Sequence, residues 1–107
     1  MEEKRKHSRL KCVFKVRFLE EKELETDNFS PNGMFVKTAF AHHFALRETV
    51  HLMIYLPPRT DRPVTVESRI VNVMENGICV AFRNLSEIIK QRLEGCYDYL
   101  CNKQNNT

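Results

Sequence analysis

The sequence predicts a small all-β domain, an antiparallel barrel followed by one α-helix. Two observations carry this prediction. Short segments alternate apolar and polar residues, and a C-terminal stretch repeats apolar residues at helical spacing. Turn-forming residues separate the alternating segments, and short strands with regular turns favour a small barrel. With 107 residues, the chain has the length of one domain with a modest core.

The strand predictions follow the alternation along the chain. Every second residue from Leu10 to Phe18 is apolar, which predicts a half-buried strand over residues 10–19. A charged turn follows, and the dipeptide Asn76-Gly77 is a strong hairpin signal. Residues 39–48 are compatible with a loop or one helical turn. Further strands are expected at residues 23–28, 34–38, 50–56, 64–73 and 78–82.

The C-terminal stretch predicts an amphipathic helix that lies across the barrel. Ser86 is a plausible N-cap. Gly95 lowers the intrinsic stability of this helix. Core contact is the favoured role of the apolar stripe, and a partner site is the alternative. The stripe consists of Leu85, Ile89, Leu93, Cys96 and Leu100. The expected organisation is therefore a basic arm over 1–9, the barrel and helix over 10–101, and a polar tail over 102–107.

Positive charge is concentrated at the N-terminal end. The net charge is +3, but residues 1–17 alone hold seven Lys or Arg against Glu2 and Glu3, a net charge of +5. The remaining residues therefore sum to −2. Such an arm suits an anionic partner. A solvated chain terminus is the alternative on charge alone.

The four cysteines indicate free thiols in a reducing compartment. None forms a C-x-x-C pair, and Cys12 and Cys79 lie among apolar strand residues, which predicts that they fill the core. A zinc site with His42, His43 or His51 is a weaker alternative, because the spacing matches no zinc motif. The chain has no apolar run of membrane-spanning length and no signal peptide, so we expect a cytoplasmic protein without membrane insertion.

No catalytic signature is visible in the sequence. There is no G-x-S-x-G elbow, no H-E-x-x-H and no P-loop. Ser30 could be imagined as a nucleophile with a nearby His, but nothing in the sequence places a base beside it. We therefore expect a binding protein rather than an enzyme, with no metal and no cofactor.

The arm and one polar segment together offer the chemistry of a nucleotide site. Arg5 and Arg9 can fork onto phosphate oxygens or onto the O6 and N7 acceptors of guanine. Asn28 carries an amide and Ser30 a hydroxyl, and both groups can pair with a purine edge or a phosphate. Gly33 allows a close approach to a ligand. The sequence around these residues, 28–33, has the composition of a loop.

These two motifs resemble those of the PilZ domain family. The family pattern is R-x-x-x-R before the first strand and D/N-x-S-x-x-G about twenty residues later. Both stand here intact, as Arg-Lys-His-Ser-Arg at 5–9 and Asn-Phe-Ser-Pro-Asn-Gly at 28–33. The segments 33–38 and 76–82 are similar to later strands of the family, and the stretch from residue 85 is similar to its terminal helix. The resemblance covers residues 4–101.

The resemblance implies a six-stranded antiparallel barrel with a terminal helix that binds the bacterial second messenger cyclic di-GMP. It implies that Arg5 and Arg9 grip phosphates and guanine. Asn28 would pair with a guanine, Ser30 would support these contacts, and Gly33 would keep the loop open. Lys4 stands where a residue influences, in some members, whether one or two ligand molecules bind.

Signalling would then pass to another protein. We expect the arm to be disordered when free and to order over the ligand, which creates a surface for an unidentified effector protein. Two alternatives stay open. One is a nucleic-acid-binding barrel that uses the basic arm with Phe14, Phe18 and Phe35. The other is a PilZ-type adaptor that binds protein without any ligand.

Overall fold

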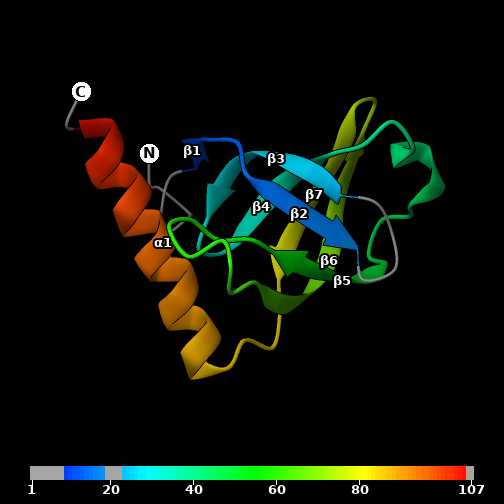
Figure 1. The fold of residues 1–107 in the computed structure, drawn as a ribbon. Helices are drawn as coiled ribbons and strands as arrows, with labels where there is room; N and C mark the ends of the chain where they lie inside the picture. Colours follow the sequence, from blue (N-terminus) through cyan, green and yellow to red (C-terminus); the bar gives the residue numbers. More distant parts are fainter. Residues whose placement is uncertain (1–8, 19–22, 106–107) are drawn as a thin grey trace, which may run out of the picture.

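The computed structural model describes residues 9–18 and 23–105. These residues contain seven strands, a short 3-10 helix and one α-helix (Figure 1). The elements are β1 (Leu10–Lys11), β2 (Lys15–Phe18), β3 (Glu23–Ser30), β4 (Gly33–Lys37), the 3-10 helix η1 (Ala41–His43), β5 (Thr49–Ile54), β6 (Val64–Met74), β7 (Gly77–Phe82) and α1 (Glu87–Asn105). The helix extends beyond Cys101, where its apolar pattern ends, so the expected polar tail is partly helical.

Six of the strands close a barrel, as the family resemblance implies. Their order is β3-β2-β5-β6-β7-β4, and the pairing of β3 with β4 joins the two edges. All pairs are antiparallel. Closure matters because an open sheet would expose unpaired backbone groups at its edges. The extra strand, β1, pairs with β3 beside β2.

The strand predicted over residues 10–19 is divided in two. Its inward side follows the expected alternation, with Phe14, Val16 and Phe18 buried. β1 pairs with one end of β3 and β2 with the other. The segment between β1 and β2 is linked to β3 by isolated backbone hydrogen bonds. The Cys12 N–H donates to Asp27 O at 3.2 Å, and the Thr26 N–H donates to Phe14 O at 3.1 Å. The interruption lies opposite a β-bulge in β3, a feature that the alternation could not reveal.

Two turns differ by a residue or more from the sequence prediction. Segment 28–33 is not a loop: β3 runs to Ser30, β4 starts at Gly33, and only residues 31–32 turn. In the β6–β7 hairpin the turn residues are Glu75 and Asn76, because Gly77 already pairs with Met74. The ambiguous segment 39–48 contains the short helix η1. The predicted turn at 19–22 lies outside the described residues.

Helix α1 lies against one side of the barrel, as expected from its apolar stripe (Figure 1). Leu93, Cys96 and Leu100 are buried in the same core cluster as the strand residues, so the stripe is core contact. Ser86 is the N-cap: its Oγ accepts a hydrogen bond from the Ile89 N–H at 3.2 Å. None of the helices in residues 9–18 and 23–105 combines the length and apolar character needed to cross a membrane.

One buried hydroxyl in the barrel gives a stability prediction. Ser68 is fully buried on β6, and within the described part of the chain its Oγ has no hydrogen-bond partner. Because such a group loses its hydration without replacement, we expect Ser68→Ala to raise the free energy of unfolding by about 1 kcal/mol. Urea denaturation measures the change. Ser30→Ala is the matched control and should lower the free energy of unfolding, since the Ser30 hydroxyl is hydrogen-bonded. A change of the same sign in both variants would contradict the prediction.

Candidate functional site

The β3–β4 hairpin carries three of the predicted site residues. Thr26 pairs with Val36 and Asn28 with Phe35, so Asp27 is the extra residue of a bulge. The buried Thr26 Oγ1 lies 2.8 Å from Asn28 O and 2.7 Å from Phe35 O and can donate to either carbonyl. The Thr26 hydroxyl therefore holds the backbone at Asn28 in place beside β4. A bulge of this kind re-aims the side chains that follow it.

Arg9 and Asn28 meet across this strand edge. The Arg9 Nη1–H donates to Asn28 Oδ1 at 3.1 Å, and the two residues are 19 positions apart in sequence. The pairing of β1 with β3 sets the contact, since Leu10 lies opposite Phe29 and Lys11 opposite Asn28. The structure therefore brings together one residue of each motif.

The Arg9 guanidinium keeps donors that this bond does not use. A guanidinium has five N–H donors in a rigid planar fork. Arg9 Nε is buried and has no hydrogen-bond partner within the described residues. The exposed Lys11 lies two residues after Arg9, so this edge carries two cationic side chains. Such an edge suits a planar group with two acceptors, for example a phosphate or the O6–N7 side of guanine.

Ser30 has a different environment from the one expected of a ligand contact. It is buried, with 1% of its surface exposed. Its Oγ accepts a hydrogen bond from the Asn32 N–H at 3.2 Å and lies 3.5 Å from Gly33 O. The hydroxyl therefore holds the two-residue turn, and in this arrangement it acts on the site through the backbone.

Gly33 is required for packing against β7 rather than for a special backbone angle. The described glycines have no positive φ. A Cβ built on Gly33 would overlap the carbonyl oxygen of Val80 and would lie 3.4 Å from Ala81 Cα. Gly33 is itself buried and pairs with Ala81. The expectation that this glycine keeps a loop open is therefore replaced by a close approach of two strands.

The remaining motif residues, Lys4 and Arg5, lie outside the described residues. The structure adds one neighbour of β1 that the sequence did not indicate. Near the end of α1, the Gln104 side-chain amide donates to Lys11 O at 2.9 Å, so the helix terminus lies beside β1. No periodicity marks Gln104, because it follows the apolar stripe in a polar stretch, and only the tertiary structure reveals it.

The aromatic residues considered for nucleic-acid stacking belong to the interior. Phe14, Phe18 and Phe35 are 7%, 8% and 6% exposed. Phe14 packs edge-on against Phe29 with ring centroids 5.4 Å apart, and Phe18 stacks on Phe44 at 5.0 Å. Bases need an open ring face to stack on. These rings do not offer one in this structure.

The cysteines divide into a core pair and surface thiols. Cys96 is buried and the half-buried Cys12 packs against the core, but Cys79 lies outside the core cluster, so its prediction as core filler is wrong. Cys79 shares its strand with the inward Ile78 and Val80 and points the other way, with its Sγ 4.0 Å from Met74 Sδ. In the described part of the chain, no three His, Cys, Asp or Glu side chains form a possible metal site.

The core thiols predict a loss of stability at alkaline pH. Burial, followed by the charge of Asp27, raises the pKa of Cys12 from 9.0 to about 11. Burial, followed by Cys12, raises the pKa of Cys96 to about 12. Above pH 9 the unfolded chain releases these protons while the folded chain keeps them, so the free energy of unfolding should fall as pH rises from 9 towards 12. Urea denaturation across this range measures it, and the double variant Cys12→Ala/Cys96→Ala should show a smaller slope.

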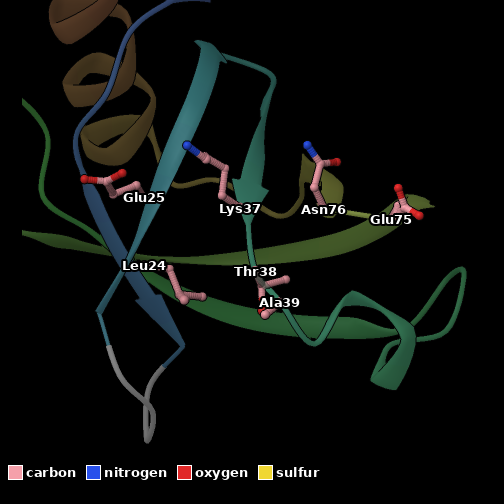
Figure 2. A pocket seen from close by; sticks show the side chains of 7 residues that line it. All are labelled: Leu24, Glu25, Lys37, Thr38, Ala39, Glu75 and Asn76. Atoms are coloured by element: carbon pink, nitrogen blue, oxygen red, sulfur yellow. The ribbon is translucent and has the colours of Figure 1, made fainter.

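A separate hollow of about 590 Å³ opens at the far end of the β3–β4 hairpin (Figure 2). It lies beside the β6–β7 turn and is lined by Glu25, Lys37 and Glu75 among others. Figure 2 shows these charged side chains spread around the rim without converging on one point. Register places it away from Arg9, because Glu25 pairs with Lys37 while Ser30 pairs with Gly33 at the turn. Its carboxylates make it a poor place for an anion.

Comparisons with known proteins identify the family and the fold. A family model described as PilZ domain matches residues 3–98. Solved structures similar to this chain include the Bacillus subtilis inhibitor of motility MotI/DgrA, with a TM-score of 0.81 and 22% identity over 98% of this chain. This chain spans 53% of that protein's length.

Two further solved structures share the fold. An uncharacterised Legionella protein has a TM-score of 0.64 and 17% identity over 92% of this chain and 99% of its own. The PilZ domain of CeSA from a cellulose-synthesizing bacterium has a TM-score of 0.62 and 12% identity, covering 81% of this chain and 91% of its own. No curated protein matches.

Proposed function

This chain belongs to the PilZ domain family, and on that premise we propose that it is a receptor for cyclic di-GMP that signals to a partner protein. The observation that carries the proposal is the hydrogen bond of 3.1 Å between Arg9 and Asn28. It joins the arm motif to the hairpin motif at one cationic strand edge. A single ligand placed there can reach both motifs at once.

Each motif residue receives a role that its chemistry allows. Arg9 uses the free side of its guanidinium on a phosphate or on the guanine acceptors, and Arg5 adds a second fork. Asn28 pairs with a guanine through its amide group. Ser30 and Gly33 support the site by holding the turn and the β4–β7 contact. For Lys4 we propose the role that the family resemblance implies, an influence on whether one or two ligand molecules bind.

The expected affinity is in the micromolar range. Each charge-assisted hydrogen bond in a partly exposed site contributes about 1.5–3 kcal/mol. Ordering the arm and immobilising the ligand cost several kcal/mol, so a net near −8 kcal/mol, or about 1 μM, is a reasonable scale. Binding needs no catalytic group, and we propose none.

The mechanism is an ordering of the arm around a fixed hairpin. β1 anchors the chain directly after Arg9, so ligand contacts from residues 1–8 would close the arm over the β3 edge. The ordered arm and the exposed face of the ligand then present a new surface to the partner. We expect ¹⁵N relaxation to show residues 1–8 becoming rigid when ligand is added. Equal mobility in both states would contradict the switch.

The test of the receptor proposal is isothermal titration calorimetry of the intact chain. Cyclic di-GMP should bind in the micromolar range, while guanosine monophosphate, which has one base and one phosphate, should bind far more weakly. The two titrations distinguish recognition of the whole ligand from general attraction of anions to the arm. No heat at tens of micromolar cyclic di-GMP would overturn the proposal.

A further inference from the structure

Two hollows that share one lining residue lie beside the β5–β6 loop, one next to the β1–β2 connection and the other next to α1. The first, of about 490 Å³, is lined by Val13, Lys15 and Tyr55 among others. The second, of about 240 Å³, lies between the loop and the helix. Pro57 lines both, so we call them together the Pro57 groove. In Figure 1 the green β5–β6 loop lies against α1 at this place.

Within residues 9–18 and 23–105, the helix side of the groove is lined by positively charged side chains and by no carboxylate. Arg59 and Arg92 line its helix side, and no Asp or Glu is present among the described residues that line either hollow. The Arg92 Nη2–H donates to the backbone carbonyl of Arg62, at 2.6 Å. This bond positions the guanidinium at the groove and leaves its charge in place, because a carbonyl is neutral. The hollow of Figure 2, with two glutamates on its rim, has the opposite character.

Apolar surface accompanies this charge. Val13, in the segment that joins β1 to β2, is 62% exposed. Tyr55 and Pro57 are half-buried beside it. An exposed apolar surface bordered by cations, with no carboxylate in its described lining, suits an apolar side chain flanked by carboxylates.

Gly95 supplies an independent indication. It lies within α1 and lines the groove, and a Cβ built on it would meet no heavy atom within 4 Å. A glycine inside a helix is less stable than an alanine, and nothing in the described fold uses the space it leaves. The missing side chain instead exposes helix backbone to a close approach from outside.

We propose that the Pro57 groove docks an acidic segment of a partner protein. An apolar side chain of that segment packs on Val13 and Pro57, its carboxylates meet Arg59 and Arg92, and its backbone approaches Gly95. This identification of the output surface rests on the proposed receptor function, because Val13 follows β1, the strand that begins directly after Arg9. The binding chemistry of the groove itself does not depend on cyclic di-GMP.

The test is a selection from a library of random displayed peptides for binding to the intact chain, with and without cyclic di-GMP. The binding sites of the best peptides are then mapped by ¹⁵N chemical-shift changes in the protein. The selected peptides should be rich in Asp and Glu around an aliphatic or aromatic residue, and their shifts should fall on the groove. Arg59→Glu and Val13→Ser should weaken binding at least tenfold. The matched controls are Arg69→Glu and Val71→Ser, which change exposed residues on β6 away from the groove.

Gly95→Ala separates docking from fold maintenance. It should weaken peptide binding severalfold while the melting temperature rises, which a purely structural glycine would not do. The docking proposal would be overturned if the selected peptides were not enriched in Asp and Glu, or if their chemical-shift changes fell outside the groove. Equal loss of peptide binding in the control variants would also overturn it. Concentration-dependent self-association lost in Val13→Ser would also overturn it in favour of a second copy. Calorimetry with cyclic di-GMP on the same variants tests the two proposals separately. If cyclic di-GMP binds but the peptides do not, only the docking proposal is refuted. If the peptides bind but cyclic di-GMP does not, only the receptor proposal is refuted.

Discussion

Replacing Arg9 with alanine is expected to weaken cyclic di-GMP binding by roughly 100-fold or more, without unfolding the barrel. The variant removes the guanidinium that joins the two motifs through Asn28. Loss of two charge-assisted hydrogen bonds to the ligand corresponds to about 3 kcal/mol or more. Arg9 precedes β1 and is only half-buried, so the core should keep its stability. Calorimetry gives the affinity, and a urea melt gives the stability.

Two controls decide how the Arg9 result is understood. Arg69→Ala removes an exposed arginine from β6 and should leave the affinity unchanged. Arg9→Lys retains the charge but not the planar fork, so it should recover only a small part of the binding. If Arg9→Lys binds as tightly as the wild type, the arm attracts the ligand by charge alone. If Arg9→Ala binds normally, the site lies elsewhere.

Replacing Gly33 with alanine should destabilise the protein by about 2–3 kcal/mol, because a Cβ there overlaps the carbonyl oxygen of Val80. The obstacle is backbone from the neighbouring strand β7, which cannot rotate away as a side chain could. Strands β4 and β7 must then separate, and the barrel closes through β4. Equilibrium urea denaturation measures the loss. Ligand binding should weaken too, since Asn28 lies on the same hairpin.

Gly95→Ala is the matched control for this variant. It makes the same chemical change in α1, where the new methyl group meets no atom within 4 Å. It should raise the free energy of unfolding by about 0.5–1 kcal/mol, because alanine favours helix over glycine. Opposite signs for the two variants would show that packing, and not glycine content, controls the effect. A neutral result for Gly33→Ala would mean that β4 and β7 do not approach as closely as the structure shows.

Much of the fold was predictable because alternation and helical spacing report which side of an element faces the core. The inward residues of β2, the covering face of α1 and the Ser86 cap all follow from local pattern. The break at 12–14 was not predictable in this way, since its inward residues keep the alternation. It follows from the bulge at Asp27 in a different strand, which no local pattern in residues 10–19 reports.

In the candidate site too, some features were predictable from the sequence and others were not. The residue types in the arm and in segment 28–33 were enough to indicate a nucleotide ligand, because forked cations and amide groups suit phosphates and guanine. The sequence predicted Ser30 and Gly33 as ligand contacts, and that stays a prediction. The structure adds a local hydrogen bond that holds the Ser30 hydroxyl in the turn, and a close steric contact of Gly33 with the backbone of β7.

By itself, then, the sequence determined the family, the all-β architecture with its terminal helix, and the class of ligand to propose, since these depend on residue type and spacing. Only the tertiary structure decided that Arg9 reaches Asn28, that β1 is separate from β2, and that the hollow beside Val13 shares Pro57 with the hollow beside Arg59 and Arg92. Each of these depends on which strands and helices lie side by side. Pairing across a closed barrel is set by the packing of the whole core, and no local stretch of sequence contains it.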